Sequence, residues 1–159
     1  MDRGVELERS AFGWYEMHRD VDVDRVGFCL LDDRTAGCSP DGLVGEDGGL
    51  ELKNPSASGH IKYLLDPALL YDSYKHQVQG SLWVTGRAWW DLASYHPTLP
   101  PVLTRHQRDD AYIAALDKAV PEFSYQLEVA KTLLRERYGM AAPVAASEGG
   151  LTIEQAVMS

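Results

Sequence analysis

Apolar residues recur at helical spacing near the start of the chain, and they predict a helix over residues 2 to about 19. Its apolar face consists of Leu7, Ala11, Trp14 and Tyr15, extended by Met17. Charged residues take up most of the other positions, which is typical of a helix that packs one side against a core. Glu8 borders the apolar face instead of lying on the outer side.

Two further helices are predicted later in the chain. Asp66 followed by Pro67 is typical of a helix start, with an N-cap acid and proline at the first helical position, and this helix is expected to end before Gly86. A third helix is predicted from residue 107 to about 138, and Pro121 is the point at which it could be interrupted.

Short strands are predicted at residues 25–31, 42–44, 50–53, 88–95 and 102–104. The stretch 45–49 is rich in residues that accept positive φ and predicts a hairpin loop between the second and third of these strands. Residues 55–65 are expected to be irregular. Pro100 and Pro101 are expected to separate the last two strands.

The order helix, three strands, helix, strand, helix predicts an α/β (mixed α+β) fold, in which a central mixed sheet is flanked by helices. A chain of 159 residues fits one domain with a single core, which we expect over residues 1–139. Residues 140–159 are rich in Ala, Gly and Ser without periodicity, and they predict a disordered or weakly ordered tail.

The net charge of −9 argues against binding nucleic acid over the whole surface. The distribution of charge weakens that objection, because acids crowd the first fifty residues. Basic side chains lie in the middle of the chain with few acids between them, at Lys53, Lys62, Lys75, His76, Arg87, Arg105, His106 and Arg108. A local basic groove on an acidic protein is therefore expected.

The two cysteines, Cys29 and Cys38, lack a CxxC spacing and are too few for a zinc site or an iron–sulfur cluster. We expect buried free thiols near neighbouring strands. No apolar run approaches the length needed to cross a bilayer, and the N-terminus lacks an apolar signal segment. We expect no membrane partner and a cytoplasmic location.

Candidate chemistry is concentrated in the segments 39–43 (SPDGL) and 50–55 (LELKNP). Glu51 and Lys53 are two apart on one strand, so their side chains point to one face, and Asp41 enters the neighbouring strand. Carboxylates are hard oxygen ligands suited to Mg²⁺, and an amine can stand beside the water that attacks phosphorus. The pattern indicates a metal-dependent phosphodiesterase. An ordinary edge hairpin with an exposed Glu/Lys pair is the alternative.

Two-metal hydrolysis needs oxygen ligands that converge on ions about 3.5–4 Å apart. Asp41 would bind both ions, and Glu51 with the backbone carbonyl of Leu52 would complete one site. A third acid is then expected, and Glu8 is our choice, because its helix can pack across the sheet. The alternative is that Glu8 is a solvated helix acid.

Lys53 would orient or deprotonate the attacking water. On the second predicted helix, Tyr74 and Gln77 are three apart on one face, with Ser81 one turn further. Gln77 could hold the water or the scissile phosphate, and a polar helix stripe is the alternative.

Other aromatic and histidine residues give weaker signals. Trp83 and one of the adjacent pair Trp89 and Trp90 are expected in the core, because neighbouring strand residues face opposite ways. The histidines show no ligand spacing and are at most candidates for phosphate contacts: His60, His76, His96 and His106.

Several motifs occur in one order along the chain: residues 3–11 (RGVELERSA), 39–43 (SPDGL), 50–55 (LELKNP), 59–61 (GHI) and 74–87 (YKHQVQGSLWVTGR). Together they resemble the phage lambda exonuclease family, also known as YqaJ-like viral recombinases, over residues 3 to about 135. The resemblance implies a restriction-endonuclease-like, PD-(D/E)xK fold. It also implies Mg²⁺-dependent digestion of one strand of linear duplex DNA from a 5′ end, which leaves a 3′ strand for a single-strand annealing recombinase.

The resemblance also implies roles for individual residues. Its metal-binding acids match Glu8, Asp41 and Glu51, its catalytic lysine matches Lys53, and its active-site helix residues match Tyr74 and Gln77. Mg²⁺ is the implied cofactor, and Mn²⁺ could replace it. The lambda enzyme is a ring-shaped homotrimer threaded by DNA, so a homotrimer is an expected assembly.

Family members usually carry several dozen residues before the first motif, including helices that line the DNA channel and an arginine that helps to receive the 5′ end. This chain starts almost at that motif. The second hypothesis is therefore a truncated, catalytically impaired nuclease domain that binds DNA or a recombinase without cutting. A nuclease with an iron–sulfur cluster is disfavoured by the cysteine count.

Overall fold

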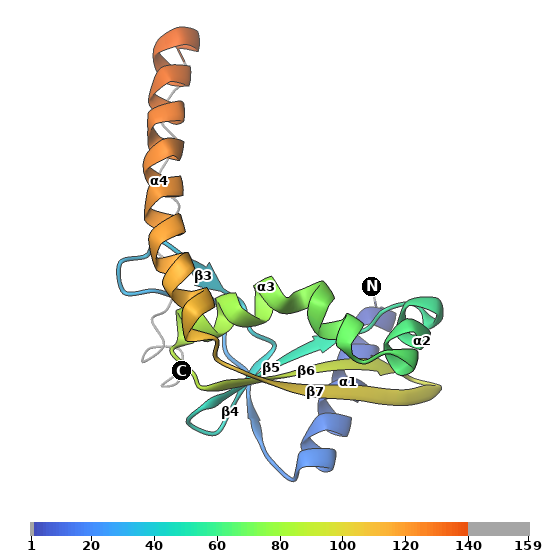
Figure 1. The fold of residues 1–159 in the computed structure, drawn as a ribbon. Helices are drawn as coiled ribbons and strands as arrows, with labels where there is room; N and C mark the ends of the chain where they lie inside the picture. The colour runs from blue at the N-terminus through green and yellow to red at the C-terminus, as the bar shows by residue number, and fades with distance from the viewer. Residues whose placement is uncertain (1, 140–159) are drawn as a thin grey trace.

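A computed structural model describes residues 2–139 of the chain (Figure 1). The helices are α1 (Asp2–Arg19), α2 (Ala57–Leu65), α3 (Ala68–Thr85) and α4 (Asp110–Tyr138). The strands are β1 (Val23–Asp24), β2 (Cys29–Leu30), β3 (Gly37–Cys38), β4 (Gly42–Val44), β5 (Gly48–Lys53), β6 (Trp89–His96) and β7 (Leu99–Gln107).

Five strands form one mixed sheet in the order β1-β4-β5-β6-β7. Neighbours in this sheet run antiparallel except β5 and β6, which run parallel and are joined by the crossover through α2 and α3. Strands β2 and β3 pair separately as an antiparallel ribbon. The predicted α/β fold with a mixed sheet flanked by helices is confirmed.

The sheet lies between two layers of helices. Helix α1 packs on one face against β5 and β6, and α2 and α3 pack on the other (Figure 1). The α3 side of the core contains Leu43, Leu70, Val78, Leu82, Trp90, Leu92, Val102 and Ile113. The α1 side contains Ala11, Phe12, Tyr15, Val44, Leu50, Leu52 and Ala93.

The β4–β5 hairpin divides its side chains between these layers. Leu50 and Leu52 are buried on the α1 side, so Glu51 and Lys53 point to the α3 side, as the alternation of a strand requires. The loop turns at Gly45, whose φ of 54° lies in the region that favours glycine. Arg87 holds the loop, since its Nη1 donates to the carbonyl oxygens of Gly45 and Gly48 at 2.7 and 2.6 Å.

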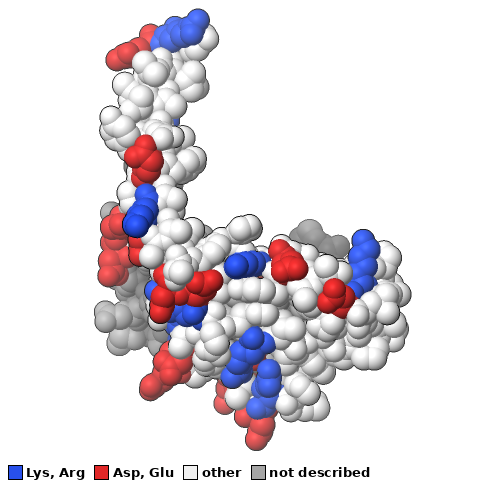
Figure 2. Space-filling view, in the orientation of Figure 1, with Lys and Arg blue, Asp and Glu red and all other residues white. Residues whose placement is uncertain are grey.

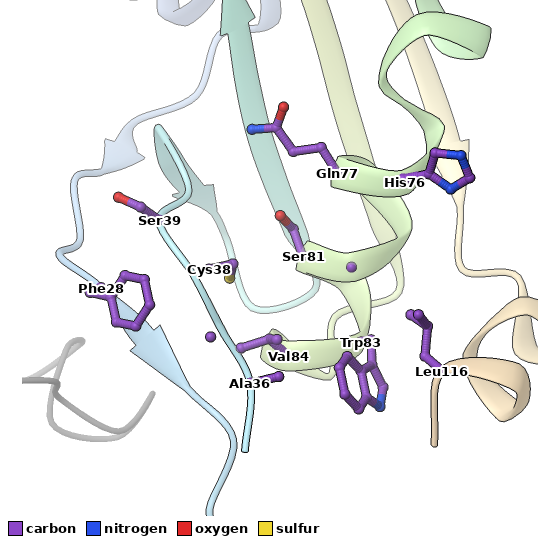
Figure 3. A pocket seen from close by; sticks show the side chains of 12 residues that line it. Phe28, Ala36, Cys38, Ser39, His76, Gln77, Ser81, Trp83, Val84 and Leu116 are labelled. Carbon is purple, nitrogen blue, oxygen red and sulfur yellow. The ribbon is translucent and has the colours of Figure 1, made fainter. Parts of the chain in front are cut away.

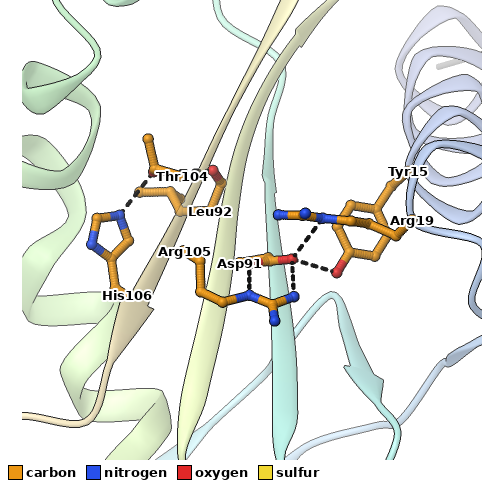
Figure 4. Close-up of polar contacts among 7 residues, drawn as sticks. All are labelled: Tyr15, Arg19, Asp91, Leu92, Thr104, Arg105 and His106. Atoms are coloured by element: carbon orange, nitrogen blue, oxygen red, sulfur yellow. Dashed lines mark hydrogen bonds and ion pairs between the residues drawn. The ribbon is translucent and has the colours of Figure 1, made fainter.

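A buried carboxylate ties α1 to the sheet (Figure 4). Asp91 on β6 is fully buried and accepts a hydrogen bond from the Tyr15 hydroxyl at 2.8 Å. Arg105 on β7 donates to both Asp91 oxygens, at 2.7 and 2.9 Å, and Arg19 lies 3.3 Å away. Burial and the Asp91 carboxylate raise the pKa of Tyr15, and the hydrogen bond to Asp91 raises the pKa of Arg105.

Two helix predictions need correction. Residues 55–65, expected to be irregular, contain α2, whose N-cap Ser56 accepts a hydrogen bond from the Gly59 amide at 3.4 Å. Helix α4 starts at Asp110 instead of residue 107 and continues through Pro121. At Pro121 the helix loses one backbone hydrogen bond. Ending the helix there would cost more, because several carbonyl groups would be left unpaired.

The first helix has the predicted bounds, and most of its predicted apolar face is confirmed. Met17 is 85% exposed, whereas Phe12 is buried with Ala11 and Tyr15. Ala11 and Tyr15 belong to the predicted face, and its other two residues, Leu7 and Trp14, are half-buried. The prediction is wrong for Met17 alone, and Phe12 extends the buried face instead.

The strand predictions also need correction. Only residues 29–30 of the expected strand 25–31 form β2, and β1 lies just before it at residues 23–24. Strand β7 is longer than expected and includes Pro100 and Pro101. Strand β7 is an edge strand, and both prolines lie at the irregularity between the Ser94–Val102 and His96–Leu99 pairs, so neither has to donate to a regular ladder.

The predicted tail at 140–159 lies outside the described residues. Within residues 2–139, no helix combines the length and apolar character that a membrane span requires.

Candidate active site

Predicted site residues from three parts of the chain meet beside the β4–β5 hairpin. Asp41 lies immediately before β4, Glu51 and Lys53 lie on β5, and Tyr74 and Gln77 lie on α3. Their contacts join them into one polar cluster, which we call the hairpin–helix cluster.

The Asp41 carboxylate is held by the neighbouring strand. Its Oδ2 accepts a hydrogen bond from the Leu52 backbone amide at 2.6 Å, so the carboxylate is oriented toward β5. Burial raises the pKa of Asp41, and the negative charge of Glu8 adds to the rise, while the Leu52 amide and Lys53 oppose it. The ionised form of Asp41 is therefore costly unless a further positive charge approaches.

Lys53 connects the strand with the helix. Its Nζ donates to Glu51 Oε1 at 2.6 Å and to Gln77 Oε1 at 2.9 Å, and it lies 4.5 Å from the centre of the Tyr74 ring. Burial raises the pKa of Tyr74, and the hydrogen bond to Tyr63 of α2 adds to this rise. The amine is thus fixed at the point where β5 meets α3.

One oxygen of Glu51 has no partner. Glu51 is only 4% exposed, and its Oε2 makes no hydrogen bond within the part of the chain that the structure describes. Burial raises the pKa of Glu51, and the nearby charge of Asp41 raises it further. An unpaired buried carboxylate oxygen beside a second carboxylate is the donor set that a hard divalent cation prefers. These two carboxylates are therefore oxygen ligands of the kind that Mg²⁺ takes, and further ligands would have to complete the site.

Glu8 lies near this cluster but does not complete it. It is exposed on α1, one turn before the buried Ala11 and Phe12, and its charge acts on Asp41. Among residues 2–139, no three His, Cys, Asp or Glu side chains converge closely enough to hold a metal ion. The ligand role of Glu8 and of the Leu52 carbonyl stays a prediction.

A groove that the sequence did not predict opens beside the cluster (Figure 3). Its volume is about 430 Å³, and it lies between the β2–β3 ribbon and α3. Gln77 belongs to both the groove and the cluster, and Ser39, two residues before Asp41, lines the groove as well. The helical spacing of Gln77 and Ser81 was the one sequence signal for this surface.

The tryptophans occupy different environments. Trp90 is fully buried, as expected for one member of the adjacent pair. Trp83 is half-buried, and its Nε1 donates to Asp117 at 2.7 Å, so the core prediction for this residue is only partly correct. Trp89 is half-buried beneath the Arg105 guanidinium, 3.5 Å from its ring centre.

The prediction of a phosphate contact is wrong for His60. This residue is fully buried, with its ring nitrogens 2.7 Å from Ser94 Oγ and 2.9 Å from the Pro100 carbonyl oxygen. His106 is half-buried and stacks on Tyr71 at 3.7 Å. His76 contacts the Tyr112 hydroxyl, and His96 stacks on His60.

Basic side chains from the middle of the chain contribute to internal contacts. Arg87, Arg105 and Arg108 all bond to protein oxygens, on the hairpin loop, Asp91 and the Leu82 carbonyl respectively. On the face drawn in Figure 2, basic and acidic side chains are interspersed. The expected basic groove is not apparent on that face.

Comparisons with known proteins identify related sequences and structures. The model of the YqaJ-like viral recombinase domain matches residues 1–88. A relative named putative uncharacterized protein ExoD, from Escherichia coli strain K12, is 34% identical over 61 residues, which cover 36% of this chain and 70% of the relative.

Two solved structures of the alkaline exonuclease LHK-Exo from Laribacter hongkongensis are similar to this chain. One, in complex with dAMP, has a TM-score of 0.78 and 35% identity, and the other has a TM-score of 0.75 and 36% identity. Each comparison covers 89% of this chain and 75% of the exonuclease. With the family match over more than half of its length, the chain belongs to the YqaJ-like viral recombinase domain family.

Proposed function

We propose that this protein is a Mg²⁺-dependent DNA exonuclease that hydrolyses phosphodiester bonds of linear duplex DNA in phage-type recombination, in the 5′-to-3′ direction. The observation that carries the proposal is the pair formed by half-buried Asp41 and buried Glu51 beside a fixed lysine, with Glu51 Oε2 left without a partner among the described residues. The similarity to an alkaline exonuclease supports the choice of substrate.

Asp41 and Glu51 would hold the cation, with the Leu52 carbonyl and Glu8 as further oxygen ligands. The bound ion would polarise the phosphate and lower the pKa of a water molecule. The protein's own contribution is positional, since the Leu52 amide fixes Asp41 and the Lys53 ammonium fixes one oxygen of Glu51.

Lys53 would stabilise negative charge that develops on the phosphorus oxygens. Its ammonium is already oriented by Glu51 and Gln77, so little reorganisation is needed during the reaction. Gln77 would hold the attacking water or the scissile phosphate through its amide nitrogen, because its Oε1 is occupied by Lys53. Tyr74 would support the lysine through its ring.

The proposed substrate and partners follow from the family. DNA ends would be the substrate, and a single-strand annealing recombinase would receive the 3′ strand. A homotrimer would be the working assembly.

The test is release of nucleotides from linear duplexes that carry 5′-phosphate or 5′-hydroxyl ends, in Mg²⁺ or in EDTA. Asp41→Asn and Lys53→Met should each lower the rate at least about 100-fold, because the first weakens binding of the cation and the second removes a positive charge beside the reacting phosphate. Circular dichroism checks that both variants keep the fold.

Matched controls are available in the same structure. Glu46→Gln changes an exposed acid of the same hairpin, and Lys118→Met changes an exposed lysine of α4, so both should keep the wild-type rate. Wild-type rates in Asp41→Asn or Lys53→Met, or rapid release in EDTA, would contradict the assigned roles. DNA binding by the wild type without any cleavage would favour the non-catalytic binding module instead.

A further inference from the structure

The two cysteines of the chain face each other across the β2–β3 ribbon. Cys29 and Cys38 are direct partners in the antiparallel register, and both are free thiols. Opposed residues of such a pair have Cα atoms about 4.5–5.5 Å apart, within the span of about 4.4–6.8 Å that a disulfide bridges. Their side chains also lie on the same side of the ribbon.

The surroundings of the pair allow a small oxidant to approach. Cys29 is buried, whereas Cys38 is half-buried and lines the groove between the ribbon and α3. Figure 3 shows Cys38 on the ribbon side of this groove and Ser81 on the α3 side. A hydrogen bond from Cys38, with a smaller effect of the Arg87 charge, lowers the pKa of the Cys29 thiol to about 7. The hydrogen bond with Cys29 and burial raise the pKa of Cys38, so Cys29 is the thiol of the pair that ionises first. The thiolate is the reactive form, and the groove reaches the pair through Cys38.

We propose that Cys29 and Cys38 are a reversible oxidation site, at which a peroxide converts the two thiols into an intramolecular disulfide. The two S–H bonds and the peroxide O–O bond break, and one S–S bond forms. The sulfurs together lose two electrons, the peroxide oxygens gain them, and the two thiol protons leave in two molecules of water. A thiol reductant reverses the reaction by exchange.

The ribbon has to contract when this bond forms. Opposed Cβ atoms in a ladder lie about 4.5–5.5 Å apart, and a disulfide holds them at about 3.5–4.5 Å. The ribbon is two residues long on each side, and such a short pair yields easily. The ladder spacing still favours the longer Cβ separation, and this opposition makes the bond easier to reduce, as in regulatory disulfides.

The contraction reaches the hairpin–helix cluster through the chain. Cys38 is joined to Asp41 by Ser39 and Pro40 alone, and the proline ring restricts the backbone between them. Ribbon β2–β3 also packs on α3, which carries Gln77. A shift of about 1 Å in Asp41 is enough to lower a metal-dependent rate about 10- to 100-fold. This second part rests on the proposed nuclease function, whereas the disulfide itself does not.

The chemical test uses the full chain treated with hydrogen peroxide at neutral pH and then with dithiothreitol. Intact mass should fall by two hydrogen atoms, both thiols should disappear in a thiol assay, and a non-reducing peptide map should contain the Cys29–Cys38 link. Dithiothreitol should restore both thiols. Persistence of free thiols, disulfide-linked dimers or oxygen adducts on Cys38 alone would each overturn the proposal.

The functional test compares oxidised and reduced protein in the Mg²⁺-dependent nuclease assay. Oxidised wild type should be about 10- to 100-fold slower, and dithiothreitol should restore the rate. Cys29→Ser and Cys38→Ser each abolish the disulfide, so each should keep the reduced rate after peroxide. If one variant fails to fold, the other supplies the control.

The outcomes separate the two proposals. Inactivity of reduced wild type would overturn the nuclease function but leave the chemical result intact. A disulfide that forms without changing the rate would overturn the regulation alone.

Discussion

At the scale of single residues, the main feature is a concentration of negative charge that the fold does not neutralise. Asp41 and Glu51 have raised pKa values, mainly because both are removed from water, and Lys53 contacts only one Glu51 oxygen. Without a bound cation, these two carboxylates therefore lower the free energy of unfolding of the protein. Sites that bind charged ligands commonly carry such a cost.

Replacing Asp41 with asparagine should separate stability from function. The asparagine side chain keeps an oxygen that accepts the Leu52 amide but carries no charge, so without metal the variant should be about 1 kcal/mol more stable than wild type at pH 7. Because the pKa of Asp41 is raised in the folded state, the cost is fully present above that value. It should disappear as the pH falls through the raised pKa toward the ordinary one. Thermal unfolding at several pH values measures this difference.

Added Mg²⁺ should reverse the order of the two proteins. The wild type should be stabilised, by about 2.7 kcal/mol at one hundred times the dissociation constant, and Asp41→Asn should respond little. Equal metal-induced shifts in melting temperature for the two proteins would contradict a ligand role for Asp41. Glu46→Gln again serves as the control, since Glu46 is an exposed acid in the same hairpin.

The sequence was sufficient for the parts of the cluster that depend on local spacing. Glu51 and Lys53 share a face because strand residues two apart must do so, and Tyr74 and Gln77 share a face because helix residues three apart do. The meeting of these two faces depends on how α3 crosses the sheet, which spacing alone does not determine. The same reason explains why the groove beside Gln77 was missed.

At the scale of elements, the position of α1 depends on the Asp91 contacts. The carboxylate joins the helix to β6 and β7 through Tyr15, Arg19 and Arg105. Because α1 also carries Glu8, these contacts determine how close that acid lies to Asp41. A change in how α1 packs on the sheet should therefore also change the position of Glu8 at the proposed metal site.

Asp91→Asn should destabilise the fold by about 2 kcal/mol, since a buried charge partner and one hydrogen-bond acceptor are lost while both arginines can still reach water. Tyr15→Phe should cost about 1 kcal/mol, because it removes one hydrogen bond. Asp110→Asn is the matched control, since the Arg108–Asp110 pair is exposed and should contribute little. Urea unfolding measures all three. An effect of Asp91→Asn no larger than that of Asp110→Asn would refute the argument.

The elements that were predicted incorrectly have weak local signals. Helix α2 is short and begins in a stretch of Pro, Ser and Gly that favours loops, and only its Ser56 cap reveals it. Strand β7 contains two prolines, which indicate a break unless the strand is known to be an edge. Edge position is a property of the sheet, so the sequence pattern could not supply it.

At the scale of the whole molecule, α4 projects from the body (Figure 1). A helix of 29 residues is about 43 Å long, and its contact with the rest of the described chain is mainly with α3. Large apolar side chains are exposed along it, at Phe123, Tyr125, Leu127, Val129, Leu133, Leu134 and Tyr138. An exposed apolar surface of this extent is typical of a contact surface.

We expect concentration-dependent association of the protein through this helix. The double substitution Phe123→Glu and Leu133→Glu should lower the association by at least about tenfold, because charged groups resist burial in an apolar contact. Sedimentation velocity over a range of concentrations measures the effect. Met17→Glu is the matched control, since Met17 is an exposed apolar residue on α1. An unchanged association constant in the double variant would show that α4 is not the contact.

The mixed direction of the strands has a consequence for folding order. Strands β4 and β5 are joined by a short turn and can pair early, whereas β5 and β6 run parallel and pair only after the chain has passed through α2 and α3. Asp41, Glu51 and Lys53 thus come together in a local event, and Gln77 arrives in a later, non-local one. In refolding experiments, recovery of nuclease activity should lag behind recovery of secondary structure. Simultaneous recovery would mean that the hairpin and the crossover fold in one step.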